Sequence, residues 1–162
     1  MTEIIIIRHG ETEWNKTGRF QGHSDVPLSE EGRAQAEALG KNLVVDHVDA
    51  IYASDLTRAM ETAAPLAERF GLPVIPDPQL RELNFGAWEG RNFNDVNAEN
   101  PDAMKNFYND PEQANIPDSE NFTDFQRRVA GRVREITAQE RGKRIVIVSH
   151  GASIRILLAD LL

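Results

Sequence analysis

Two short β-branched runs constrain the fold of this chain more than any other feature. Residues 4–7 are four consecutive isoleucines, and residues 145–148 read Ile-Val-Ile-Val. Such runs are too short for helices and are apolar on both faces, which is typical of strands in a parallel sheet that helices cover on both sides. For residues 4–7 the pattern predicts a central strand of that sheet.

Helical and strand-like patterns alternate around these two runs. Further short strands are predicted at 49–53 and at 72–76, the latter near a sheet edge because of its prolines. Ser29 and Ser54 are the candidate N-caps of the helices that follow them. Helical spacing of apolar residues predicts helices at about 30–43, 54–70, 122–140 and from 152 onward. The alternation predicts an α/β fold with three layers, in which a mainly parallel central sheet has helices on both faces.

The length of 162 residues predicts a single domain over residues 1–162. Residues 84–120 are polar and rich in asparagine, with three prolines. A stretch of this kind is typical of short helices and loops inserted into a domain, and such insertions often carry function. We therefore expect residues 84–120 to form a lid or specificity insertion.

Charge and cysteine content narrow the classes of partner. The net charge of −8 opposes nucleic acid or an anionic membrane as the main partner, because such a surface repels polyanions. The absence of cysteine excludes disulfides, thiolate nucleophiles and cysteine-bound metals. No apolar stretch approaches the roughly 18 residues of a membrane span, and no signal peptide is evident, so we expect a cytoplasmic protein. A small anionic ligand is compatible with this net charge, because a few arginines can make a pocket locally positive.

Each of the two strong strands ends in a histidine. The first continues into Arg8-His9-Gly10 and the second into Ser149-His150-Gly151. Because the carboxyl ends of parallel strands meet at one edge of a sheet, we expect His9 and His150 to share a site. A guanidinium beside His9 suits an anion, and a neutral imidazole can attack phosphorus. A metal site is the alternative, although a fixed positive charge at Arg8 opposes a divalent cation.

Several motifs spread along the chain carry a resemblance to a known family. They are Arg8-His9-Gly10-Glu11-Thr12 with Trp14-Asn15, Gln21-Gly22, Asp25-x-Pro27-Leu28-Ser29, Ser54-Asp55-Leu56-x-Arg58-Ala59, Leu80-Arg81-Glu82, Phe85-Gly86-x-Trp88-Glu89-Gly90 and Ser149-His150-Gly151. In this order they resemble the histidine phosphatase superfamily, in its phosphoglycerate-mutase-like branch. The resemblance covers the chain from Glu3 to its end and implies a phosphoglycerate-mutase-like fold.

The resemblance also implies roles for individual residues. It makes His9 the phosphorylated nucleophile and Glu82 the proton donor. Arg8, Arg58 and His150 would join His9 in gripping the phosphoryl group, whose oxygens suit the bidentate forks of arginine. The further contacts to phosphate or leaving group would come from Asn15, Gln21, Gly22 and the backbone of Gly151. No metal and no cofactor is implied.

Simpler interpretations stay open for single residues. Arg58 could pair with Asp55 at i,i+3 on a helix surface. Glu82 could form an ion pair with Arg81 at a strand end, and His150 could be a hydrogen-bonded core histidine. His23 and His47 receive no role.

The resemblance leaves open which molecule receives the phosphoryl group from histidine: water, as in a phosphatase, or the substrate, as in a mutase. Residues 83–90 are similar to the phosphatase-type motif, and Arg91 and Lys105 are the only basic residues in 84–120, where acidic residues outnumber them. We therefore favour a metal-independent phosphatase that hydrolyses a small-molecule phosphate monoester through a phosphohistidine intermediate, with α-ribazole phosphatase as one candidate. The alternatives are a cofactor-dependent phosphoglycerate mutase, a metal-dependent hydrolase using His9, His150 and Glu82, and a non-catalytic binding module of the same fold.

The expected partner is a small phosphorylated metabolite, and a homodimer is compatible with the sequence. Members of this family usually continue for several tens of residues after the helix that follows the second histidine, and they add a strand there. We therefore expect the C-terminal strand of the family to be missing from this chain. The last helix is rich in apolar residues, namely Ile156, Leu157, Leu158, Leu161 and Leu162.

Overall fold

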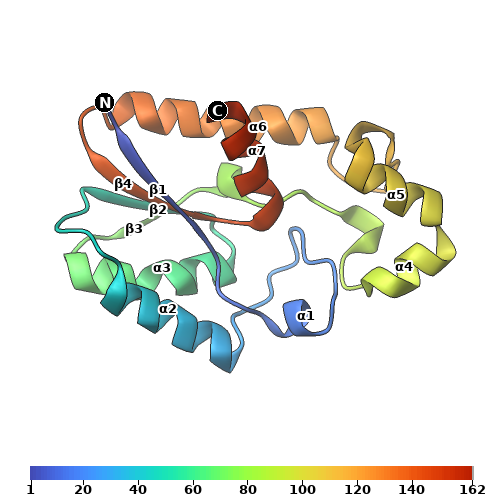
Figure 1. Cartoon of the computed structure of the whole chain (residues 1–162), viewed down its shortest axis with the longest axis horizontal. Helices are drawn as coiled ribbons and strands as arrows, with labels where there is room; N and C mark the ends of the chain where they lie inside the picture. The colour runs from blue at the N-terminus through green and yellow to red at the C-terminus, as the bar shows by residue number, and fades with distance from the viewer. Residues whose placement is uncertain (162) are drawn as a thin grey trace.

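The isoleucine-rich runs form two neighbouring strands of a four-stranded parallel sheet (Figure 1). The computed structural model describes the backbone of residues 1–161 and the side chains of residues 1–160. The side chains of Leu161 and Leu162, which the sequence places in an apolar row, lie outside this part. The strands are β1 (Glu3–Arg8), β2 (Ala50–Ala53), β3 (Val74–Pro76) and β4 (Arg144–Ser149), in the order β1-β4-β2-β3. All three pairings are parallel, as predicted.

The position of β1 differs from the prediction, because β1 is an edge strand. Within residues 1–161 it pairs with β4 alone. Its isoleucines are nonetheless covered on both faces: Ile4 and Ile6 pack against one core cluster, and Ile5 and Ile7 against the other. An apolar run thus reports that both faces of a strand are packed, and it carries no information on how many strands flank it. The proline-flanked strand β3 lies at the opposite edge, as predicted.

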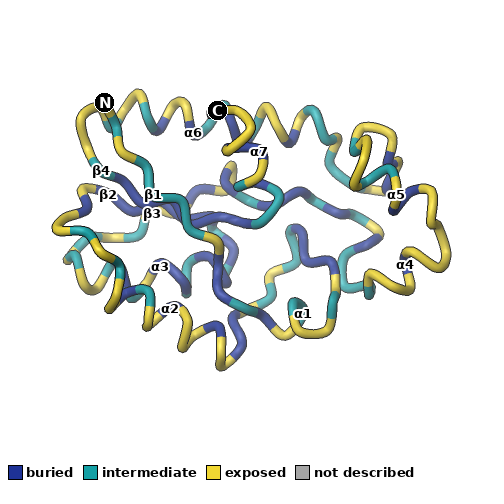
Figure 2. The backbone as a smooth tube through the Cα atoms, in the orientation of Figure 1, coloured by how far each residue is buried: buried dark blue, intermediate teal, exposed yellow. Residues whose placement is uncertain are grey.

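Two pairs of helices cover the sheet and give the three predicted layers (Figure 1). On one face, α2 (Glu30–Asn42) and α3 (Thr57–Phe70) pack on a cluster that includes Ile51, Val146 and Val148. On the other face, α6 (Phe122–Gln139) and α7 (Gly151–Leu161) pack on a cluster that includes Ile145 and Ile147. Figure 2 shows β4 buried between these layers, with exposed residues on the outer faces of the helices.

Local signals explain where α2 and α3 begin and end. The side chain of Ser29 accepts a hydrogen bond from the amide of Gly32 and caps α2, as predicted. The chain leaves α3 at Gly71 in a left-handed conformation, with φ of 64°. The predicted cap of α3 was wrong: its N-cap is Leu56, and the hydroxyl of Ser54 closes the preceding turn by accepting a 3.4 Å hydrogen bond from the Leu56 amide.

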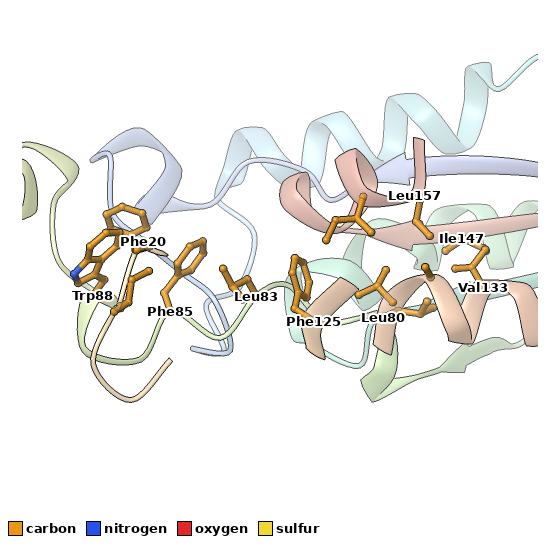
Figure 3. Packing of buried hydrophobic residues seen from close by; sticks show 14 of the residues in the cluster. Phe20, Leu80, Leu83, Phe85, Trp88, Phe125, Val133, Ile147 and Leu157 are labelled. Atoms are coloured by element: carbon orange, nitrogen blue, oxygen red, sulfur yellow. The ribbon is translucent and has the colours of Figure 1, made fainter. Parts of the chain in front are cut away.

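Short elements fill the side of the molecule beyond the carboxyl ends of the strands (Figure 1). They are α1 (Glu13–Lys16), η1 (Pro78–Leu80), η2 (Gly86–Trp88), α4 (Phe93–Glu99), α5 (Pro101–Asn109) and η3 (Pro111–Gln113), where η marks a 3₁₀ helix. The rings of Phe20, Phe85 and Trp88 pack together beneath them, and this packing continues through Leu83 to the core of the sheet (Figure 3). Among residues 1–161 no helix is long and apolar enough to cross a lipid bilayer.

Candidate active site

The sheet brings His9 and His150 together. β1 and β4 pair in register up to Arg8 opposite Ser149, so the next residue of each strand leaves the sheet at the same place. The centroids of the two imidazole rings are 5.1 Å apart. His9 is 8% exposed and His150 is fully buried. The predicted meeting of the two histidines at one sheet edge is confirmed.

Hydrogen bonding sets the tautomer of His9. Its Nδ1 lies 2.7 Å from the carbonyl oxygen of Gly10. A carbonyl only accepts, so Nδ1 carries the hydrogen and Nε2 keeps its lone pair. Burial, and then the charge of Arg58, lower the pKa of His9 to about 4, with a smaller contribution from Arg8. The ring is therefore neutral near pH 7 and presents a nucleophilic nitrogen.

His150 is an unusual buried histidine because neither ring nitrogen has a hydrogen-bond partner within the described part of the chain. Burial lowers its pKa well below the ordinary value, and the charge of Arg58 adds to this effect. Buried polar atoms are nearly always satisfied, so an unpaired pair of nitrogens indicates a place for a ligand. The alternative of a hydrogen-bonded core histidine is wrong for His150.

Arg58 is the buried cation of the site. It extends from α3, is 1% exposed, and donates to the carbonyl oxygens of Ser24 at 2.8 Å and Gly22 at 2.7 Å. Its Nε has no partner among the described residues. Burial lowers its pKa to about 10, so the guanidinium is charged at neutral pH. The alternative pair with Asp55 is not formed, since Asp55 binds Arg81 through two 2.6 Å hydrogen bonds.

A carboxylate shapes the loop that receives Arg58. Glu89 accepts hydrogen bonds from the amides of His23 at 2.8 Å, Ser24 at 2.9 Å and Phe85 at 3.1 Å. Gly22 adopts φ of 54°, and a β-carbon at this position would collide with Glu89 Oε1. Glycine is therefore required at position 22 for both conformation and space. Through this loop, Glu89 holds the two carbonyl groups that orient Arg58.

The carboxylate of Glu82 binds the backbone amides of the first turn of α7. Its Oε2 accepts from the amide of Ala152 at 2.9 Å, and its Oε1 accepts from the amides of Ser153 at 3.2 Å and Leu83 at 3.0 Å. The residue is 9% exposed. The alternative ion pair with Arg81 is not formed, because Arg81 binds Asp55 instead. The carboxyl group of Glu82 is thus held by amides that follow His150 by two and three residues.

A cavity of about 430 Å³ opens beside His9. Its lining residues are Arg8, His9, Gly10, Glu11, Asn15, Gln35 and Phe93. The guanidinium of Arg8 lies against Gly151, whose β-carbon, if present, would be 3.7 Å from Arg8 Cζ. No hydrogen bond or ion pair engages this guanidinium within residues 1–160, so it is available to an anion.

A polar network built on Thr12 holds the remaining predicted residues. Asn15 and Thr12 cap α1 reciprocally, with amide-to-oxygen distances of 3.0 and 3.1 Å. The Thr12 hydroxyl also donates to Gln21 Oε1 at 2.7 Å. Asn15 lines the cavity, whereas Gln21 is buried beside it.

The prediction from sequence missed four residues that organise the site. Thr12 and Glu89 stand inside quoted motifs without a role, and Thr62 was not singled out. The hydroxyl of Thr62 accepts from the Gly10 amide at 2.9 Å and donates to the Arg58 carbonyl at 2.7 Å. His23, to which no role was given, has Nε2 2.9 Å from the carbonyl oxygen of Glu82. An acidic residue within a glycine-flanked motif was the signal that could have identified Glu89.

The arrangement is suited to a phosphoryl group. His9, with an unprotonated Nε2, lines a cavity together with Arg8. Arg58 is close enough for its charge to lower the pKa of His9, and the unpaired imidazole of His150 lies 5.1 Å from the His9 ring. The same positive charges oppose a metal ion beside the histidines. Over residues 1–161 no group of three or more histidine, aspartate or glutamate side chains is placed to hold one.

Comparison with known proteins gives the same family. A family model described as "Histidine phosphatase superfamily (branch 1)" matches residues 4–162. A curated relative from Yersinia pestis (strain Pestoides F), named "Probable phosphoglycerate mutase GpmB", is 36% identical over all of this chain and 75% of its own length.

Two solved structures are similar over nearly the whole chain. The α-ribazole phosphatase from Shigella flexneri aligns with a TM-score of 0.86 and 34% identity, over 98% of this chain and 78% of that one. A mycobacterial glucosyl-3-phosphoglycerate phosphatase, solved with VO3, aligns with a TM-score of 0.89 and 37% identity, over 97% of this chain and 80% of that one. With a family match from residue 4 onward and relatives above 30% identity, the chain belongs to branch 1 of the histidine phosphatase superfamily.

Proposed function

We propose that this protein is a metal-independent phosphatase that hydrolyses a small-molecule phosphate monoester through a phosphohistidine at His9. One observation carries the proposal: His9, a neutral, buried imidazole whose Nε2 keeps its lone pair, lines a cavity together with Arg8, whose guanidinium has no partner within residues 1–160. A nucleophile and cationic oxygen ligands are the parts that phosphoryl transfer requires.

In the first step, His9 Nε2 attacks phosphorus. A bond forms between nitrogen and phosphorus, the bond from phosphorus to the leaving oxygen breaks, and Glu82 gives its proton to that oxygen, so that an alcohol departs. Arg8, Arg58 Nε and His150 bind the equatorial oxygens, on which negative charge is spread during transfer. Asn15, Gln21, Gly22 and the backbone of Gly151 complete the contacts.

In the second step, water replaces the alcohol. Glu82, now a carboxylate, takes a proton from water as the water oxygen attacks phosphorus. The nitrogen–phosphorus bond breaks, inorganic phosphate leaves, and both His9 and protonated Glu82 are restored. The cycle consumes one ester and one water and needs no metal or cofactor.

The space for the leaving group extends past Phe93. This half-exposed ring lines the cavity beside His9 and also a second cavity of about 340 Å³ that is lined by Asn94, Asn97, Lys105 and Tyr108 as well. An aromatic ring followed by amide groups suits a leaving group with an apolar part and several hydroxyl or amide groups. A small phosphorylated metabolite of the size of a nucleoside phosphate would fill this space.

A phosphoglycerate mutase is the second candidate, because the curated relative is named as one. A mutase must bind the carboxylate or second phosphate of its substrate. The lid offers little charge for this purpose: Arg91 is paired with Glu99 at 2.5 Å, which leaves Lys105 as the basic residue of 84–120 without an ion pair in the described chain. This favours hydrolysis.

The test is phosphate release from p-nitrophenyl phosphate in excess EDTA, near pH 6. The proposal predicts turnover that survives the chelator and that His9→Ala abolishes, whereas His47→Ala, at the opposite end of the sheet, retains it. Activity lost to EDTA and restored by a divalent ion would overturn the proposal.

A second assay separates the candidate reactions. α-Ribazole 5′-phosphate, glucosyl-3-phosphoglycerate and 3-phosphoglycerate are supplied in turn, and free phosphate and isomerised product are both measured. Isomerisation of 3-phosphoglycerate in the presence of a bisphosphorylated primer, without net phosphate release, would establish the mutase instead.

A further inference from the structure

We propose that Arg128 of α6 is a positioning residue that fixes Glu82 for proton donation. The inference rests on the proposed function, in which Glu82 protonates the leaving oxygen. Arg128 itself does not line the cavity beside His9. It contacts the backbone on both sides of Glu82, through the carbonyl oxygens of Arg81 and Glu82.

All five N–H groups of Arg128 are engaged. Nε and one Nη2 hydrogen bind the two carboxylate oxygens of Glu120, at 2.7 and 2.8 Å. Nη1 donates to the carbonyl oxygens of Gln79 at 2.8 Å and Arg81 at 3.1 Å, and Nη2 donates to that of Glu82 at 3.1 Å. Three carbonyl groups of one short loop therefore converge on a single guanidinium.

Two of these carbonyl groups belong to the peptide units on either side of the Glu82 Cα. Holding both of them restricts the two backbone dihedrals that aim the side chain. Each has a second donor as well: the Ser153 hydroxyl donates to the Arg81 oxygen at 3.1 Å, and the His23 ring donates to the Glu82 oxygen at 2.9 Å. The backbone of residue 82 is thereby clamped between α6, α7 and the loop that contains Gly22.

The environment of Arg128 differs from that of an ordinary surface ion pair. Its side chain is 20% exposed and that of Glu120 is 19%, whereas the pair of Arg127 and Asp124 on the same helix is 75% and 64% exposed. Glu120 also accepts from the amide of Asn84 at 3.3 Å, just beyond the clamped segment. The pair thus ties α6 to both ends of the Glu82–Asn84 segment.

A lysine cannot replace this arrangement, because its ammonium is a point charge with three donors, whereas the planar fork of arginine carries five. Arg128→Lys keeps a cation beside Glu120 but gives up part of the clamp on the carbonyl groups. A small displacement of a catalytic group lowers the rate of the step that depends on it.

The experiment uses the leaving group as the readout. p-Nitrophenolate departs readily without a proton, whereas an alkoxide needs one from Glu82. We compare kcat/KM for p-nitrophenyl phosphate and an alkyl phosphate in the wild type, Arg128→Lys and Glu82→Gln. Arg128→Lys should reduce kcat/KM for the alkyl ester by about tenfold or more and that for the aryl ester by less than about threefold, since general acids contribute typically 10²–10⁴-fold. In a Glu82→Gln background, Arg128→Lys should leave unchanged the ratio of the kcat/KM for the alkyl ester to that for the aryl ester.

Arg132→Lys is the matched control. Arg132 lies one turn further along α6 and anchors the same loop through Asp77 at 2.5 Å, away from Glu82. Its substitution should leave the ratio of the two kcat/KM values at the wild-type level. An equal fall for both esters in Arg128→Lys, or no change in either, would overturn the proposal.

A second variant covers a failure of Arg128→Lys to fold. The double substitution R128Q with E120Q removes the clamp without leaving a buried charge unpaired, and it should shift the ratio in the same direction. Loss of folding in both variants would make Arg128 a residue of stability alone and overturn the proposal. If Glu82→Gln itself leaves the ratio unchanged, the assignment of Glu82 as the donor fails; if Glu82→Gln shifts it and Arg128→Lys does not, only the positioning role fails.

Discussion

The imidazole rings of His9 and His150 lie 5.1 Å apart at the end of two paired strands, and both are held in a neutral state. Arg58 contributes to this state in each ring, since its charge is the second cause of both lowered pKa values. Burial is the larger cause of the lowered pKa of His9, and the same guanidinium that would bind a phosphoryl oxygen also helps to keep the nucleophile unprotonated. In the proposed mechanism, Arg58 therefore serves both to bind the phosphoryl group and to favour the neutral form of His9.

The lowered pKa of His9 predicts a dependence of stability on pH. The unfolded chain binds a proton at this residue below about pH 6.5, whereas the folded chain binds one only near pH 4. Between these values the unfolded state holds more protons, so the contribution of His9 to stability is complete above pH 6.5 and is lost as the pH falls toward 4. The maximal loss is about 3 kcal/mol.

Urea unfolding at intervals from pH 7 to pH 4 measures this effect. Comparison with a variant that lacks His9 separates it from the titration of the carboxylates. The free energy of unfolding should fall less steeply in His9→Gln than in the wild type. Equal slopes in the wild type and His9→Gln would contradict the neutral state assigned to His9.

Gly22→Ala should destabilise the protein and impair the site. The positive φ of Gly22 adds backbone strain of about 1–2 kcal/mol for alanine, and the new β-carbon must displace the carboxylate of Glu89. Gly71→Ala is the control, because Gly71 has a similar φ of 64° but no heavy atom within 4 Å of the added carbon. We expect Gly22→Ala to lower the melting temperature more than Gly71→Ala and to weaken phosphate binding, which Gly71→Ala should leave intact. Similar melting temperatures for the two variants would show that Glu89 yields at no cost.

Arg58→Lys should weaken anion binding and stability together. The substitution removes the paired donors to Gly22 and Ser24 and the unpaired Nε, and it leaves one buried and one partly buried carbonyl group less well satisfied. A loss of about 1–3 kcal/mol is expected for such groups. Calorimetric titration with inorganic phosphate should show at least tenfold weaker binding than the wild type, whereas Arg33→Lys, at an exposed pair on α2, should bind normally. Unchanged phosphate affinity in a folded Arg58→Lys protein would remove Arg58 from the site.

Much of this fold could be predicted because its signals are local. Apolar runs identify the strands, Ser29 caps α2, and Gly71 ends α3. The meeting of His9 and His150 follows from the rule that parallel strands present their carboxyl ends at one edge. The edge position of β1 could not be predicted, because the packing of its two faces does not depend on the number of flanking strands.

The hydrogen bonds that hold the site residues in place could not be predicted from the sequence either. Arg128, His23 and Arg58 bind backbone carbonyl groups, which every residue has, so no side-chain pattern marks their partners. The charges that sequence spacing suggested were also paired differently: Asp55 binds Arg81, and Arg58 donates instead to the carbonyl oxygens of Gly22 and Ser24. Such choices depend on loop geometry that only the folded chain defines.

The central claim is that His9 carries the phosphoryl group, and trapping the phosphoenzyme tests it most directly. The protein is mixed with a phosphate monoester in excess EDTA, quenched within milliseconds under alkaline conditions, which preserve phosphohistidine, and mapped by mass spectrometry. The account predicts an acid-labile phosphoryl group on His9 that forms and decays within one turnover and is absent in His9→Ala. Turnover without any phosphoryl group on His9, or with the group on another residue, would contradict it.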